Sequence, residues 1–253
     1  MKKLLVSLGV ILVVVFSCTK DGGDVNGISS GGDGTGQGGS MAKFSISGDH
    51  LFLINDYQLK IYDIQNESNP MAVGTLNVDF GIETVFTLED HLFIGSINGM
   101  YIYDISNPSL IKYLSFYEHI TSCDPVVAND TLAFVTLNSG SACNWQGGAN
   151  RLDVLDIKDK EYPKLLKSTE LTEPLGLGLY EHYVIVCEGS HGVEIFDFSN
   201  LNYLEKVGGI AGIDAYDVII KEDHMFLVGE DGLFQYDISN IEDVNLISNI
   251  LFE

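Results

Sequence analysis

The sequence predicts an all-β protein, a five-bladed β-propeller whose blades are four-stranded antiparallel sheets. A short strand ending in Asp recurs at intervals of 41, 52, 41 and 40 residues, at Asp63, Asp104, Asp156, Asp197 and Asp237. Self-similarity with a period near forty residues and strand-like patterning is typical of propeller blades. The turn residues agree with this fold, because Asn98-Gly99 and Asp231-Gly232 are tight-hairpin signals. The repeated Asp is expected to accept hydrogen bonds from backbone N–H groups of the turn that follows it.

Each repeat is predicted to hold four strands in the same order. In the first repeat, these are apolar runs near 42–47, 51–54, 60–64 and 71–78, separated by polar turns. One such sheet cannot bury both of its faces, so the repeats must pack around an axis. The first repeat begins with its innermost strand and the last ends with its outermost. We therefore expect a ring closed without strand exchange, by apolar packing between blades one and five.

Residues 1–17 have the features of a secretory signal peptide. Lys2 and Lys3 precede an apolar run, 4–16, that is too short to span a bilayer. The stretch Val15-Phe16-Ser17-Cys18 resembles the lipobox of bacterial lipoproteins, in which the cysteine is lipidated. The alternative is an ordinary signal peptide followed by a chance cysteine. The lipobox reading predicts that Cys18 is the anchor.

Residues 18–41 are predicted to form the lipidated cysteine and a flexible linker rich in Gly, Ser and Asp, followed by the propeller at 42–253. About twenty such residues reach roughly 25 Å. Thr19 stands where an Asp would signal retention in the inner membrane, and Lys20-Asp21 partly resembles a surface-export signal of gram-negative lipoproteins. We therefore expect a lipid-anchored protein of the outer membrane, with exposure on the cell surface as one of two orientations.

The charge of the chain argues against nucleic acid as a partner. The sequence has 13 basic and 36 acidic residues, a formal net charge of −23, and Arg151 is its single arginine. Phosphate backbones would be repelled, and no basic stripe is available to release counterions.

The cysteines after Cys18 are predicted to include one disulfide. Cys123 lies on the connection into blade three, and Cys143 lies in the loop between the second and third strands of that blade. These two segments emerge at the same end of a propeller, so a Cys123–Cys143 disulfide is expected, worth about 3 kcal/mol in the chain-entropy account. Cys187 is expected to be a buried small residue, with pairing or reactivity as the alternative.

A binding surface is predicted at the end of the propeller that carries this insertion. The loop holds the single tryptophan, Trp145, and His119, Asp124 and His191 are expected at the same end. A lone aromatic side chain on a rigid loop is a plausible anchor for a ligand. The alternative is that Trp145 packs onto its own loop. The other histidines, His50, His91, His182 and His224, hold one equivalent position in four of the blades and would be spread around the ring, so no metal site is expected. No cofactor is expected either.

An enzyme is the alternative function. Glu83, Asp124 and Asp217 lie at the entrances of predicted inner strands, which surround the central channel. Paired carboxylates of this kind are what glycoside hydrolysis requires. The chain lacks aromatic-rich substrate platforms near these positions, and it has no Ser-His-Asp arrangement or Gly-rich phosphate loop. The pattern therefore favours a binding module over an enzyme.

The repeats resemble the LVIVD repeat, a propeller repeat of secreted bacterial proteins, over roughly 42–250. The stretches that carry the resemblance are SCDPVVANDTLAFVTLNSG, NRLDVLDI, GLGLYEHYVIVCEG, AYDVIIKED and VGEDGLFQYDI. They look like the gram-negative lipoprotein members, in which the cysteine-bearing insertion of the third blade also occurs. The resemblance implies the fold and an envelope location, and it brings no catalytic residues. We therefore expect a recognition or scaffold module that binds a protein or a glycan.

Replacement of the predicted anchor tests this reading. Cys18→Ala should abolish metabolic labelling with a fatty acid and release the protein from membranes, because the linker that follows is too polar to hold it there. If the variant stays in the membrane fraction after a high-salt wash, Cys18 is not the anchor.

Overall fold

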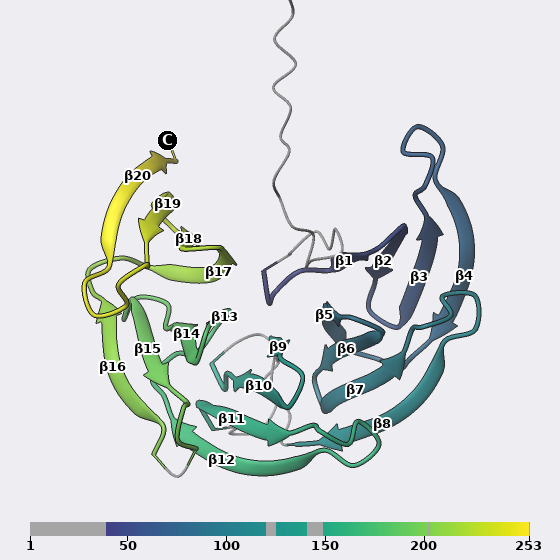
Figure 1. The fold of residues 1–253 in the computed structure, drawn as a ribbon, viewed down its shortest axis with the longest axis horizontal. Coiled ribbons are helices and arrows are strands. Elements are labelled where there is room, and N and C mark those ends of the chain that lie inside the picture. The colour runs from purple at the N-terminus through teal and green to yellow at the C-terminus, as the bar shows by residue number, and fades with distance from the viewer. Residues whose placement is uncertain (1–38, 120–124, 141–148, 202, 253) are drawn as a thin grey trace, which may run out of the picture. The chain divides into compact units, whose positions relative to one another are not determined.

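The computed structural model describes residues 39–119, 125–140, 149–201 and 203–252, all within one compact unit, Gly32–Glu253. The described residues form five four-stranded antiparallel sheets, each built from four consecutive strands, and the sheets are arranged as the blades of a propeller (Figure 1). This confirms the predicted fold class and the absence of strand exchange. In this part of the chain, we find no helix long and apolar enough to cross a membrane.

In every blade, the four strands run outward from the axis in chain order. Blade one contains β1 (Phe44–Ser47), β2 (His50–Ile54), β3 (Gln58–Asp63) and β4 (Met71–Asn77). Blade two contains β5 (Ile82–Leu88), β6 (His91–Ser96), β7 (Gly99–Asp104) and β8 (Lys112–Glu118). Blade three contains β9 (Val126–Ala128), β10 (Leu132–Leu137), β11 (Arg151–Asp156) and β12 (Lys164–Glu170). Blade four contains β13 (Leu177–Tyr180), β14 (Tyr183–Cys187), β15 (Val193–Asp197) and β16 (Glu205–Ile210). Blade five contains β17 (Ala215–Lys221), β18 (His224–Gly229), β19 (Gly232–Asp237) and β20 (Asn245–Leu251).

The repeated Asp at the end of the third strand fixes the turn that follows it. In all five blades, its Oδ1 accepts a hydrogen bond from the backbone N–H two residues later, at 2.6–3.0 Å. Side-chain and backbone hydrogen bonds from the Ser at that position lower the pKa of Asp104, Asp197 and Asp237. This is the Asx-turn chemistry that the sequence predicts, and it explains why the same residue recurs in every blade.

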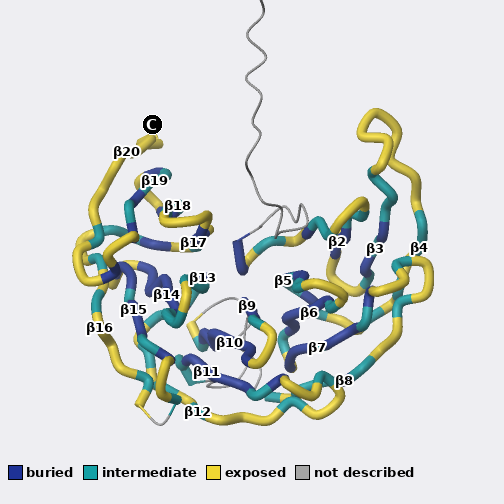
Figure 2. Tube along the Cα trace, in the orientation of Figure 1, coloured by how far each residue is buried: buried dark blue, intermediate teal, exposed yellow. Residues whose placement is uncertain are grey.

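Four apolar cores hold neighbouring blades together. Each core joins the face of one blade to the facing side of the next, as where Phe52 and Leu59 of blade one pack with Leu92 and Ile94 of blade two. The equivalent clusters join blades two and three, three and four, and four and five. Figure 2 shows the burial concentrated on the middle strands, whereas the outermost strands β4, β12, β16 and β20 are largely exposed.

Blades one and five each keep one face that none of these described cores covers. The two faces lie on either side of the opening in the ring (Figure 1). Strand register places the following side chains on them: Phe44, Leu51, Leu53 and Tyr62 in blade one, and Ile219, Phe226, Val228, Leu233 and Ile250 in blade five. We call these two sets the terminal faces.

The apolar packing expected between blades one and five is therefore not formed by the described cores. One residue supplies a physical reason. Gln235 occupies the position that is Ile61 in blade one and Ile102 in blade two, both of them buried. Its amide oxygen accepts a hydrogen bond from Ser248 at 3.2 Å, and burying the amide against an apolar face would cost free energy.

Candidate functional site

The two ends of the ring are joined at the axis by a polar contact. Ser40 Oγ donates to Asp217 Oδ1 at 3.0 Å, and Met41 N donates to Asp217 Oδ2 at 3.3 Å. Ser40 Oγ also accepts a hydrogen bond from Leu177 N of blade four at 2.7 Å. The carbonyl of Ala42, the residue after Met41, accepts a hydrogen bond from Val85 N of blade two. Residues 40–42 thus form an axial strap that connects blades two, four and five.

Close approach of two glycines encloses the carboxylate of Asp217. A Cβ atom at Gly39 would lie 2.0 Å from Asp217 Oδ2, and one at Gly176 would lie 2.2 Å from Asp217 Oδ1. Only glycine fits at these positions without displacing the carboxylate. Burial raises the pKa of Asp217 above its usual value, and the hydrogen bonds from Val218, Met41 and Ser40 offset part of that rise.

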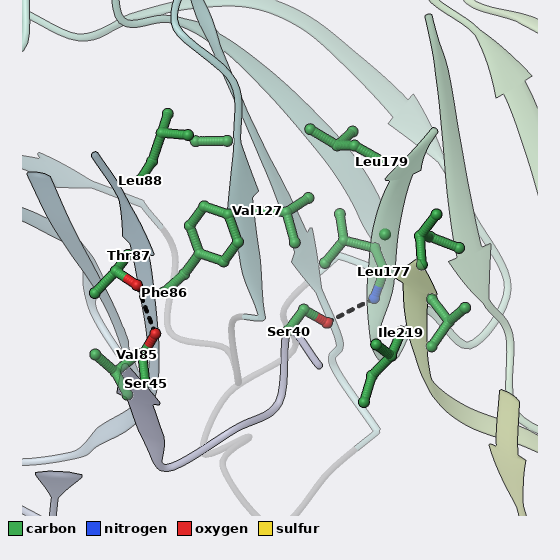
Figure 3. Close-up of a pocket in the computed structure, with 14 residues that line it drawn as sticks. Ser40, Ser45, Val85, Phe86, Thr87, Leu88, Val127, Leu177, Leu179 and Ile219 are labelled. Carbon is green, nitrogen blue, oxygen red and sulfur yellow. Dashed lines mark hydrogen bonds between the residues drawn. The ribbon is translucent and has the colours of Figure 1, made fainter. Parts of the chain in front are cut away.

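A cavity of about 260 Å³ lies on the axis beside the strap, between the innermost strands of all five blades. Figure 3 shows Ser40 near one end, with Leu88 and Leu179 toward the other and Phe86 and Val127 on the wall. We call this cavity the axial pocket. Its lining residues are Ser40, Ser45, Val85, Phe86, Thr87, Leu88, Val127, Ala128, Leu177, Gly178, Leu179, Val218, Ile219 and Ile220. None of them has an ionisable side chain.

The axial pocket carries one polar feature besides Ser40. The hydroxyls of Ser45 and Thr87 lie 2.6 Å apart and share a hydrogen bond between blades one and two (Figure 3). One of their two hydroxyl hydrogens is used within the pair. The second hydrogen and the remaining lone pairs can serve a ligand.

The predicted binding residues fall partly outside the described structure. Asp124 and Trp145 lie outside the described residues, as do Cys18, Cys123 and Cys143. His119 follows β8 of blade two, and its ring centroid lies 6.0 Å from that of Tyr117. His191 lies in the hairpin between β14 and β15 of blade four, with Nδ1 3.7 Å from Glu173 Oε2. The two histidines share the end of the propeller where the inner strands begin, but their blades are not neighbours.

The carboxylates of the predicted alternative function have different surroundings. Asp217 is engaged by the axial strap, whereas Glu83 lies on β5, where burial raises its pKa and Lys43 partly opposes the rise. Glu188 is almost fully buried beside β14, accepts from Thr172 N at 3.0 Å, and also has a raised pKa because of burial. Across the described ranges, no group of three His, Cys, Asp or Glu side chains is placed to hold a metal ion.

Sequence reasoning missed the axial pocket and the strap. The signal for the pocket was the set of small residues on the innermost strands, Ser45, Ala128 and Gly178, beside aliphatic neighbours. Ser40 gave no signal, because it ends a Gly-rich stretch whose composition is that of a linker. The expectation for Cys187 is confirmed, since it is a free cysteine with no exposed surface.

Comparison with known proteins supports the repeat and the fold. The LVIVD repeat matches residues 38–78 and 83–117, so the chain carries LVIVD repeats in its first two blades. No curated protein matches the sequence.

Three solved structures illustrate the similarity in fold. A functionally unknown protein from Desulfotomaculum acetoxidans has a TM-score of 0.69 at 9% identity, over 83% of this chain and 69% of that one. A protein from Lactobacillus plantarum has a TM-score of 0.66 at 12% identity, over 80% of this chain and 68% of that one. BamB from Moraxella catarrhalis has a TM-score of 0.53 at 15% identity, over 83% of this chain and 62% of that one.

The raised pKa of Asp217 predicts a pH dependence of stability. A carboxyl whose pKa is higher in the folded state stabilises the fold most fully below its unfolded pKa, and this contribution is lost as the pH rises through the folded pKa. Asp217→Asn removes the titrating group. In urea titrations, the free energy of unfolding of wild type, relative to that of Asp217→Asn, should therefore fall as the pH rises above about 4, the usual pKa of Asp.

The control is Asp243→Asn, an exposed residue in the turn before β20. This variant removes one carboxyl group at a position away from the strap. Parallel pH profiles for wild type and Asp217→Asn would contradict a buried, strap-bound carboxyl at Asp217.

Proposed function

We propose that this chain is a binding or scaffold module, anchored to the outer membrane through a lipid on Cys18, which recognises a protein partner through its terminal faces. The observation that carries this proposal is the exposure of apolar residues at positions that are buried in the neighbouring blade. Phe44 is 52% exposed and its equivalent Val85 is 1% exposed. Leu53 is 37% exposed, against 0% for its equivalent Ile94.

The face of blade five follows the same pattern. Phe226, Val228 and Leu233 are partly exposed, whereas Phe52, Ile54 and Leu59 hold the equivalent positions in the core between blades one and two. Ile250 on β20 is 65% exposed, although its equivalent Leu76 packs against that core. Covering one such side chain stabilises a complex by about 1.5–3 kcal/mol before the costs of association.

The internal cores indicate which chemistry fits the terminal faces. Each apolar blade face that takes part in one of the four cores packs against an antiparallel sheet that presents aliphatic and aromatic side chains. A partner that supplies an apolar β-sheet face therefore matches them. A glycan matches them less well, because these aliphatic faces offer few hydrogen-bonding groups for its hydroxyls.

Charge favours a different protein over a second copy of this chain. Each copy carries a formal net charge of −23, so self-association would bring two strongly acidic molecules together. A neutral or basic partner would gain from the same field. The predicted linker, with a reach of roughly 25 Å, would leave the terminal faces free to meet a partner at the membrane surface. The insertion loop with Trp145 stays a predicted second contact.

Capture experiments with matched variants test this proposal. The mature protein, carrying a photo-crosslinker at a linker position, is incubated with native envelope extract, and cross-linked bands are compared among variants. Leu53→Asp and Ile250→Asp should remove a band that wild type gives, because each places a charge on an apolar contact. Leu166→Asp should keep it, since Leu166 is similarly exposed, at 46%, on β12 of blade three.

Two results would contradict the proposal. One is an identical band pattern for wild type and all three variants while their melting temperatures agree. The other is self-association of the purified protein that Leu53→Asp abolishes, measured by sedimentation velocity, since the occupant of the terminal faces would then be a second copy.

A further inference from the structure

The axial pocket is a second site, which shares only Ile219 with the terminal faces, and its walls define what it can hold. Val85, Leu177 and Val218 are almost fully buried, so the walls are set by the cores between the blades. Phe86 adds an aromatic ring, tilted against Phe93 at a centroid distance of 6.3 Å. A ligand here would contact the aliphatic and aromatic side chains of the wall, together with backbone groups of the innermost strands (Figure 3).

The polar side chains of the pocket have free capacity for one ligand group. Ser40 Oγ already donates to Asp217 and accepts from Leu177 N, so its single hydrogen is used. The Ser45–Thr87 pair has one hydroxyl hydrogen left to donate, and it can also accept. This capacity suits one hydroxyl or one carbonyl oxygen on the ligand.

A charged ligand is disfavoured for two reasons. The lining residues hold no ionisable side chain, so an ion would lose its hydration without gaining a partner of opposite charge. The turns that end the innermost strands also carry Glu89, Glu181 and Glu222, each with a positive φ of 49–52°. These carboxylates surround the end of the strands at which Leu88, Leu179 and Ile220 lie, and they would repel an anion.

The volume sets the size of the ligand. An apolar cavity of about 150 Å³ holds one benzene molecule, which is about 25 Å³ for each non-hydrogen atom. At the same volume per atom, the axial pocket of about 260 Å³ holds about ten non-hydrogen atoms. A medium-length alkyl alcohol or a two-ring aromatic alcohol has this size.

We propose that the axial pocket binds a small, neutral and largely apolar molecule of about ten non-hydrogen atoms that carries one hydroxyl or carbonyl group. The hydroxyl or carbonyl pairs with Ser45 and Thr87, and the apolar part lies against Phe86, Val127 and Leu177. This site goes beyond the proposed protein-binding function and does not depend on it.

Titration with 1-octanol tests the proposal. Methyl resonances of the purified protein, labelled at Val, Leu and Ile, are followed as 1-octanol is added. Saturable shifts should appear at pocket methyls such as those of Val85, Val127 and Leu177. Octanoate at pH 8 has the same chain with a charged head group, and it should bind at least about tenfold more weakly because its carboxylate is desolvated without a partner.

Two pocket variants and one control variant test whether the shifts arise from the pocket. Ile219→Trp places a large ring at a partly exposed wall position and should abolish the saturable shifts. Ile247→Trp is the control, since Ile247 is 49% exposed on β20 and does not line the pocket. The double variant Ser45→Ala/Thr87→Val removes both hydroxyls without leaving one unpaired, and it should weaken 1-octanol binding by about fivefold.

The proposal is overturned by any of three results with folded protein. These are the absence of saturable shifts with 1-octanol, equal affinity for octanoate and 1-octanol, and unchanged binding in Ile219→Trp. If Ile219→Trp does not fold, the double variant Ser45→Ala/Thr87→Val tests the proposal, because it preserves the shape of the pocket. Unchanged affinity of this variant for 1-octanol would contradict the role assigned to the two hydroxyls.

Discussion

The hydrogen bonds between Ser40 and Asp217 are the contact on which the arrangement of the ends depends. Every other junction in the ring is an apolar core between neighbouring sheets, whereas the described contact between the start of blade one and blade five is this polar one at the axis. Buried groups of this kind are costly to leave unpaired, so losing one partner would expose the other to the full cost of desolvation. A few polar atoms therefore connect the first and last blades, whereas apolar cores connect the other neighbouring blades.

The presence of a polar strap in place of an apolar core connects the two proposed sites. The strap lets the ends of the chain meet at the axis without covering the terminal faces, and Ser40 also lines the axial pocket. Ile219 belongs to both sites, because it lies on the exposed face of blade five and on the pocket wall. The recognition surfaces are thus consequences of how the ring is joined, and neither requires a reactive side chain.

The sequence predicted the parts of the fold that repeat. The Asp at the end of each third strand could be read directly, because an Asx turn is local and needs only the residues beside it. The number of blades and strands followed from the period. The repeat did not predict that blades one and five leave their facing sides uncovered. This depends on Gln235, which replaces an aliphatic residue at one position, and on the hydrogen bond from Ser40 to Asp217, 177 positions away.

The candidate site was less predictable for the same reason. Asp217 was expected as one of several carboxylates at the channel mouth, and its engagement by the strap depends on two distant glycines that leave room for it. The axial pocket is lined from five separate strands, and the small residues that could have marked it, Ser45, Ala128 and Gly178, stand on three different strands, so no single stretch of sequence reveals it. Trp145 and the Cys123–Cys143 pair, which a local insertion did mark, lie outside the described residues.

The most direct test of this account is the accessibility of two equivalent positions on neighbouring blades. Leu53→Cys and Ile94→Cys place a thiol at the same position of blades one and two, and maleimide labelling of the native protein is followed by mass spectrometry of the modified peptides. The account predicts rapid labelling of the Leu53→Cys variant and protection of the Ile94→Cys variant, because only Ile94 is covered by a neighbouring blade. Equal protection of both thiols in folded, monomeric protein would contradict it, since blade five would then cover blade one and leave no terminal face for a partner.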